Sequence, residues 1–101
     1  EMQRAYARRR EIIVDGISKI TGLRCFAPRG AFYALLDISE TGMRAGDFAL
    51  DLLEKERVAV VPGDAFGTAS SAYVRLSFAT SEENIREAIR RIRRYMESLA
   101  P

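Results

Sequence analysis

An arginine inside an apolar run is the residue of this chain best suited to bind an anionic ligand. Residues 73–78 (YVRLSF) alternate as a β-strand does, which places Arg75 on the face opposite Val74 and Leu76. A guanidinium among apolar neighbours is costly to desolvate unless an anion meets it, and its planar fork matches a carboxylate. Taken without its context, however, Arg75 is better explained as an exposed strand residue or as half of an internal ion pair.

Other groups that could perform chemistry are few. The chain has no histidine, which excludes Ser-His and Cys-His catalysis and ordinary zinc sites within it. It also has no glycine-rich phosphate-binding loop. Lys19 and Lys55 lie in segments with a helical pattern, and we expect both at the surface. Cys25, the single cysteine, is expected to be a small buried hydrophobic residue. The chain is therefore expected to need another piece of protein for catalysis.

The elements that position these residues follow from apolar periodicity. We expect one domain over residues 1–101, of α/β class and α+β type, with a small mixed sheet of about four strands covered by helices. The expected order is α-β-β-α-β-β-α. Helices are expected at 2–20, 47–56 and from about 81 to 99, strands at 23–27, 31–38, 58–61 and 73–79, and loops at 39–46 and 64–72.

Finer features can also be predicted. Both faces of the strand 31–38 are largely apolar, which predicts a strand that is central or covered on both sides. Thr80 and Glu83 have the spacing of a capping box before the last helix. Two sets of residues are expected to face the core: Phe48, Leu52 and Leu53 in the second helix, and Ile85, Ile89, Ile92, Met96 and Leu99 in the third.

The outer face of the last helix is rich in arginine. Interspersed glutamates allow helix-spaced ion pairs, so we expect a solvated surface before a protein contact or a nucleic-acid site. The net charge of +2 does not by itself imply nucleic acid. No apolar run reaches the roughly 18 residues of a membrane-spanning helix, and the first residues do not resemble a signal peptide. We therefore expect neither a nucleic-acid partner nor a membrane, and a cytoplasmic location.

Three segments in fixed order give Arg75 a context. They are residues 28–33 (PRGAFY), 58–67 (VAVVPGDAFG) and 73–80 (YVRLSFAT). Together they resemble the C-terminal small domain of fold-type I PLP-dependent aminotransferases of class I and II, the group that includes aspartate aminotransferase. The resemblance extends over essentially the whole chain. It implies that Arg75 binds the α-carboxylate of an amino-acid substrate, and that Gly30, Phe32 and Phe66 border the same pocket.

The same resemblance implies what this chain lacks. The family holds pyridoxal 5'-phosphate (PLP) on a lysine of a large domain, whose motifs are absent here. We therefore expect no catalytic, cofactor-binding or metal-binding residue in this chain and no activity of the chain alone. The full-length enzyme is expected to be a homodimer that contains PLP and acts on an amino acid and a 2-oxo acid.

Several alternatives stay open. One is an autonomous α/β regulatory module that binds a small carboxylate. A second is a nucleic-acid-binding domain that uses the basic last helix. Within the resemblance, PLP-dependent lyases and synthases share the carboxylate-binding arginine. Acidic, aromatic and small aliphatic amino acids all remain possible substrates.

Overall fold

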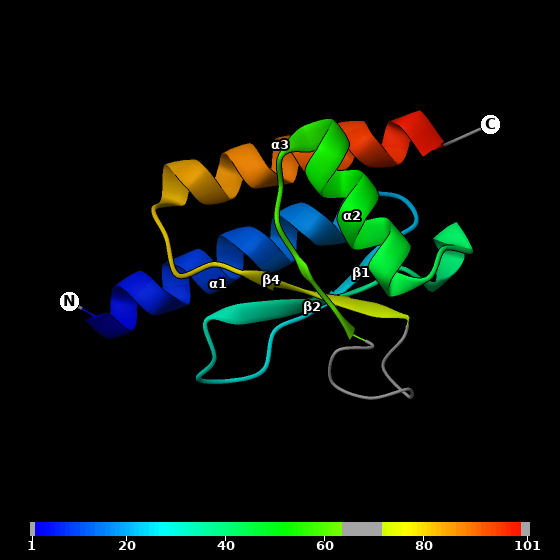
Figure 1. Cartoon of the computed structure of the whole chain (residues 1–101). Coiled ribbons are helices and arrows are strands. Elements are labelled where there is room, and N and C mark those ends of the chain that lie inside the picture. The colour runs from blue at the N-terminus through cyan, green and yellow to red at the C-terminus, as the bar shows by residue number, and fades with distance from the viewer. Residues whose placement is uncertain (1, 64–71, 100–101) are drawn as a thin grey trace.

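The computed structural model describes residues 2–63 and 72–99, which form a four-stranded sheet with helices on one side (Figure 1). The expected order of helices and strands is confirmed, with one short 3-10 turn in addition. The elements are α1 (Met2–Ser18), β1 (Arg24–Phe26), β2 (Tyr33–Asp37), η1 (Ser39–Thr41), α2 (Ala45–Glu56), β3 (Val61–Pro62), β4 (Tyr73–Ser77) and α3 (Glu82–Leu99).

The sheet has the strand order β1-β2-β4-β3. The predicted central position of β2 is confirmed, because β1 and β4 flank it. In the β2–β4 register, Leu35 lies opposite Arg75 and Leu36 opposite Val74. All pairings among the described strands are antiparallel, a detail in which this α/β fold differs from the mixed sheet that we expected.

The hydrophobic core lies between the sheet and the helices. Ala34 and Leu36 of β2 and Val74 and Leu76 of β4 turn their side chains to this side and are buried there. The helices complete the core with Ile12, Ile13, Ile17, Phe48, Leu52, Ile85, Ile89, Ile92 and Tyr95. Alternation along β2 and β4 therefore gives the sheet one buried face.

The opposite face of the sheet carries the other strand residues. Tyr33, Leu35, Tyr73 and Arg75 are half-buried there, and none of the described helices covers them (Figure 1). The described helices therefore cover β2 on one side only, so of the two predicted alternatives, a central position or cover on both sides, the first is confirmed. Because the helix-free face includes Arg75, it is the face on which a ligand of this residue would bind.

Helices α1 and α3 lie side by side and run in the same direction (Figure 1). Gly16 is the point of close approach: a Cβ atom at this position would lie 2.6 Å from Cδ1 of Ile89. The absence of a side chain at Gly16 thus allows the two helices to pack closely over the core.

The start of α3 differs from the prediction. The backbone N–H of Asn84 donates to Oγ of Ser81 at 3.0 Å, so Ser81 is the N-cap. Thr80 instead accepts a hydrogen bond from the side-chain amide of Asn84 at 2.9 Å. The predicted box of Thr80 and Glu83 was wrong because the helix begins one residue later than that box requires.

Three other local predictions need correction. Leu53 was expected to face the core but is 45% exposed. The strand expected at 58–61 is shorter and later, at Val61–Pro62. Helix α2 begins at Ala45 rather than Asp47. Most of the loop expected at 64–72, including Phe66, lies outside the described residues.

The inner face of α3 includes a residue that the apolar stripe missed. Tyr95 is 1% exposed, whereas Met96 and Leu99 are only partly buried. The Tyr95 ring packs edge-to-face on Phe48, with centroids 5.3 Å apart. A tyrosine can be buried in this way when its hydroxyl finds a hydrogen-bond partner.

Candidate functional site

Arg75 lies in the middle of β4, between β2 and β3. Its neighbours across the two strands are Leu35 and Val61, whose side chains are aliphatic. Arg75 faces away from the helices, in agreement with the predicted alternation, and is half-buried. The residue is thus fixed at its backbone by pairing on both sides, while its side chain lies on the helix-free face.

An aromatic ring lies against this arginine. Cζ of Arg75 is 5.0 Å from the centroid of the Tyr33 ring. Tyr33 pairs with Ser77, so it is the diagonal neighbour of Arg75 across the β2–β4 ladder. This distance allows a cation–π interaction, which attracts the guanidinium to the ring face without using its N–H groups.

Asp37, at the other end of β2, has a local role. The backbone N–H of Ser39 donates to Oδ1 of Asp37 at 2.9 Å. This hydrogen bond is the main reason why the pKa of Asp37 lies below its usual value. The carboxylate of Asp37 therefore stabilises the turn that follows β2.

Gly30, predicted to border the site, lies in the turn before β2. Its φ of +82° is in the left-handed region, which favours glycine, while a Cβ atom would meet nothing within 4 Å. Its N–H donates to the hydroxyl of Tyr6 at 2.9 Å. Local backbone geometry thus suffices to explain a glycine here, and a role of Gly30 in binding stays a prediction.

Phe32, also predicted to border the site, lies at the end of the β2–β4 ladder. Its carbonyl accepts the N–H of Phe78 at 2.8 Å. The Phe32 ring packs edge-to-face on Tyr6, with centroids 4.9 Å apart, and is tilted against Phe78 at 5.9 Å. It is nevertheless 42% exposed. The structure therefore gives Phe32 ring contacts with Tyr6 and Phe78 and brings Tyr33 to Arg75. Phe66, the fourth predicted site residue, lies outside the described residues.

Tyr33 is the site residue that the sequence analysis did not single out. The pattern places it on the same strand face as Leu35 and Asp37, but a contact with Arg75 depends on how two distant strands pair. The alternation of β2 and β4 predicts that Tyr33 and Arg75 each lie on one face of their own strand. The register that makes Tyr33 and Arg75 diagonal neighbours came from the structure.

Both lysines lie at the surface, as predicted, Lys19 in the turn just after α1 and Lys55 in the last turn of α2. Lys19 pairs with Asp15 at 3.2 Å and its side chain is 67% exposed. Lys55 pairs with Asp51 at 3.3 Å along α2. Both are ordinary helix-spaced ion pairs.

Cys25 is half-buried in β1. Burial raises the pKa of its thiol to about 11, although the charge of Arg10 acts in the opposite direction. The thiol is therefore protonated at neutral pH, which fits a packing role and not a nucleophile. Among the described residues, no group of three or more His, Cys, Asp or Glu could hold a metal ion.

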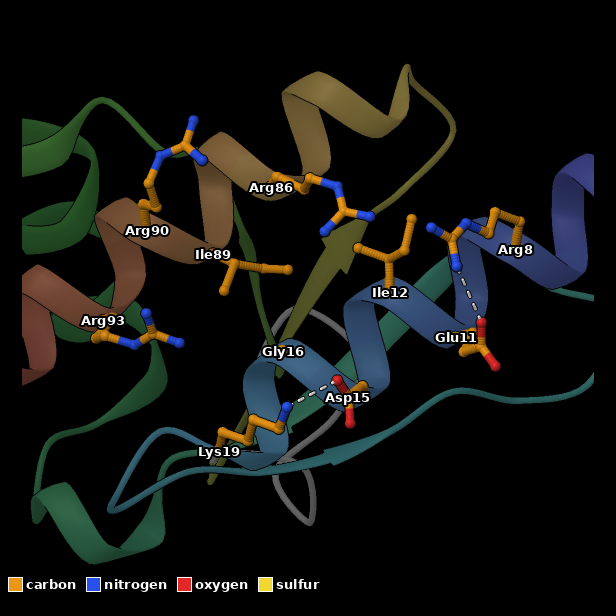
Figure 2. A pocket seen from close by; sticks show the side chains of 10 residues that line it. All are labelled: Arg8, Glu11, Ile12, Asp15, Gly16, Lys19, Arg86, Ile89, Arg90 and Arg93. Atoms are coloured by element: carbon orange, nitrogen blue, oxygen red, sulfur yellow. Dashed lines mark hydrogen bonds and ion pairs between the residues drawn. The ribbon is translucent and has the colours of Figure 1, made fainter.

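A basic groove of about 530 Å³ lies between α1 and α3 (Figure 2). Its two carboxylates are paired along their own helix, Glu11 with Arg8 at 3.3 Å and Asp15 with Lys19 at 3.2 Å. Arg90, on the opposite wall, pairs with Glu87. The groove lies on the helix side of the sheet, whereas Arg75 lies on the other side. It is thus a charged helix surface separate from the predicted site.

In the part of the chain that the structure describes, no helix is long and apolar enough to cross a membrane.

Comparison with known proteins identifies the family to which the chain belongs. The family model "Aminotransferase class I and II" matches residues 1–92. The chain belongs to this family.

Individual relatives agree with the family match. The chain is 45% identical over 96 residues to the putative aminotransferase YugH of Bacillus subtilis, covering 95% of this chain and 25% of that protein. It is 45% identical over 97 residues to an aspartate aminotransferase of Pyrococcus horikoshii, covering 96% and 25%. The crystal structure of an aromatic aminotransferase from Pyrococcus horikoshii matches with a TM-score of 0.91 at 40% identity, covering 98% of this chain and 27% of that one. The chain thus spans about a quarter of the length of these relatives.

Proposed function

We propose that this chain is the C-terminal small domain of a longer PLP-dependent aminotransferase, which transfers an amino group between an amino acid and a 2-oxo acid. The family match over residues 1–92 supports the activity. The quarter-length coverage of relatives supports a role as one part of a larger enzyme. In this proposal the rest of the enzyme packs on the helix-free face of the sheet, and the complete protein is a cytoplasmic homodimer.

The chemical support for this proposal comes from the position of Arg75. A guanidinium lies half-buried on the helix-free face, between aliphatic cross-strand neighbours and against the Tyr33 ring. Such a group binds a carboxylate through charge-assisted hydrogen bonds, each worth about 1.5–3 kcal/mol. In this role, Arg75 holds the α-carboxylate of the amino acid and of the 2-oxo acid, and so fixes where the reacting carbon lies.

The other proposed pocket residues have weaker support. Phe32 is partly exposed and is the chain neighbour of Tyr33, so its ring can border the pocket. Gly30 lies in the turn that leads into this strand. The role of Phe66 follows from the family resemblance alone.

The residues of this chain do not fit a PLP site. A Schiff base needs a lysine whose amine is available in a cleft, whereas Lys19 and Lys55 are exposed and ion-paired at the surface. We therefore propose that the cofactor is bound entirely by the remainder of the enzyme, and that this chain alone does not catalyse transamination.

Substitution of Arg75 in the full-length enzyme tests its role. Arg75→Gln should raise KM for amino acid and 2-oxo acid about tenfold to a hundredfold, because charge-assisted hydrogen bonds to the carboxylate are lost. PLP content, measured by absorbance, should not change. Arg24→Gln is the matched control, since Arg24 is an exposed arginine on the edge strand β1. Unchanged kinetics of Arg75→Gln would remove the residue from the site.

The reaction itself is tested by product analysis. The full-length enzyme should convert a 2-oxo acid to the matching amino acid in the presence of an amino donor. Aspartate and aromatic amino acids are the first donors to try, given the names of the relatives. Elimination products without amino transfer would instead indicate a PLP-dependent lyase.

A further inference from the structure

We propose that Tyr33 is a positioning residue, which holds the Arg75 guanidinium in the orientation that receives the substrate carboxylate. This inference rests on the proposed role of Arg75. It adds a residue whose ring acts through that arginine.

The contact is a product of the strand register. Tyr33 begins β2 opposite Ser77, and Arg75 lies opposite Leu35, so the two side chains are diagonal neighbours on one face. Long side chains reach each other across such a diagonal. The 5.0 Å from Cζ of Arg75 to the ring centroid lies within the distance of a cation–π contact.

Arg75 needs a support of this kind. Its side chain is long and flexible, and ordering it before the substrate arrives costs conformational entropy. A ring face attracts the cation through its charge, and this contact itself uses none of the N–H donors. Tyr33 can therefore order the guanidinium without competing for the groups that bind the substrate.

The ring is itself on a rigid part of the sheet. Tyr33 belongs to an interior strand, and its chain neighbour Ala34 is fully buried against the helices. On the other side of Tyr33, the carbonyl of Phe32 accepts the N–H of Phe78 at 2.8 Å. Backbone pairing and core packing thus fix where the Tyr33 side chain begins, which a positioning residue requires.

The test compares three single variants of the full-length enzyme. Tyr33→Leu removes the aromatic face, and should raise KM for both substrates about two- to fivefold with little change in kcat. A loss of this size corresponds to a cation–π contact of about 0.5–1 kcal/mol. Tyr33→Phe keeps the ring and should restore KM to the unsubstituted value. Tyr73→Leu makes the same change on the same sheet face at a ring that has no cation–π contact with Arg75 among the described residues, and should leave KM unchanged. If Tyr33→Leu does not fold, Tyr33→Met is the substitute.

A double-mutant cycle separates positioning from general packing. In an Arg75→Gln background, Tyr33→Leu should have no further effect on KM, because the group that it positions is gone. Equal effects of Tyr33→Leu with and without Arg75 would overturn the proposal. So would a loss in Tyr33→Phe as large as that in Tyr33→Leu, which would indicate direct use of the hydroxyl. If Arg75→Gln itself leaves KM unchanged, Arg75 does not bind the substrate. Tyr33 then has no substrate-binding arginine to position, and the proposal fails because its premise fails.

Discussion

The hydroxyl of Tyr95 donates a hydrogen bond to Oδ2 of Asp51 at 2.7 Å, and this bond joins α3 to α2 across 44 residues of chain. The hydrogen bond is the largest cause of the lowered pKa of Asp51, with a smaller contribution from Lys55. Burial and the same bond raise the pKa of Tyr95. The pair lies on the helix side of the sheet, away from Arg75, so its effects belong to stability.

Tyr95→Phe should therefore destabilise the fold in a pH-dependent way. The folded-state pKa of Asp51 is below the unfolded value of about 3.9, so the stabilisation is fully present above that pH and is lost as the pH falls through the lowered pKa. Denaturant unfolding at pH 7 and near pH 2.5 measures this difference. We expect Tyr95→Phe to be less stable than the parent at pH 7, and this deficit to be smaller at pH 2.5. The same deficit at both pH values would show that Asp51 is not the partner that matters.

Ser81→Ala should reduce the free energy of unfolding by about 1 kcal/mol, since it removes the N-cap of α3. The substitution removes Oγ of Ser81, which accepts a hydrogen bond from the Asn84 N–H. Thr80→Ala is the matched control and should cost less. Within the described residues, the Thr80 hydroxyl bonds only the exposed Asn84 side-chain amide, and the Thr80 carbonyl, which accepts from Arg9, is retained in alanine. Urea denaturation of both variants compares them, and a larger loss for Thr80→Ala would contradict this assignment of the cap.

Cys25 should react slowly with thiol reagents. Because burial raises the pKa of its thiol to about 11 from 9.0, the thiolate is roughly a hundredfold rarer at pH 8 than in the unfolded chain. Alkylation by iodoacetamide should therefore be at least that much slower in buffer than in urea. Mass spectrometry follows the reaction, and comparable rates in the two conditions would mean that the thiol is open to solvent.

The sequence predicted the fold where the pattern was local and long. Helix α1 and the apolar side of α3 follow from three- and four-residue spacing, and the alternation of 73–78 correctly separated Arg75 from Val74 and Leu76. Predictions failed where one residue of shift or one distant partner decided the outcome. The cap of α3 moved from Thr80 to Ser81 because the helix began later.

Burial of single residues shows the same limit. Leu53 is apolar and lies next to the buried Leu52, yet it is exposed because α2 presents only a narrow stripe to the core. Tyr95 carries a polar group, yet it is buried because Asp51 on another helix accepts its hydrogen bond. Residue type gives only the average tendency of a side chain to be buried. In each protein, the burial of a given residue depends on the partners that its side chain meets.

The amino-acid sequence by itself determined the order of the elements, the face of the strand on which Arg75 lies, and the motifs that relate the chain to aminotransferases. These features depend on residues that are close together along the chain. The regular geometry of helices and strands fixes which of these residues share a face. Only the tertiary structure decided that Tyr33 meets Arg75, that Ser81 caps α3 and that Tyr95 binds Asp51. The strand and helix contacts join segments about forty residues apart, and the cap depends on where α3 begins. The strand register, the start of α3 and the packing of the helices are all determined when the core forms.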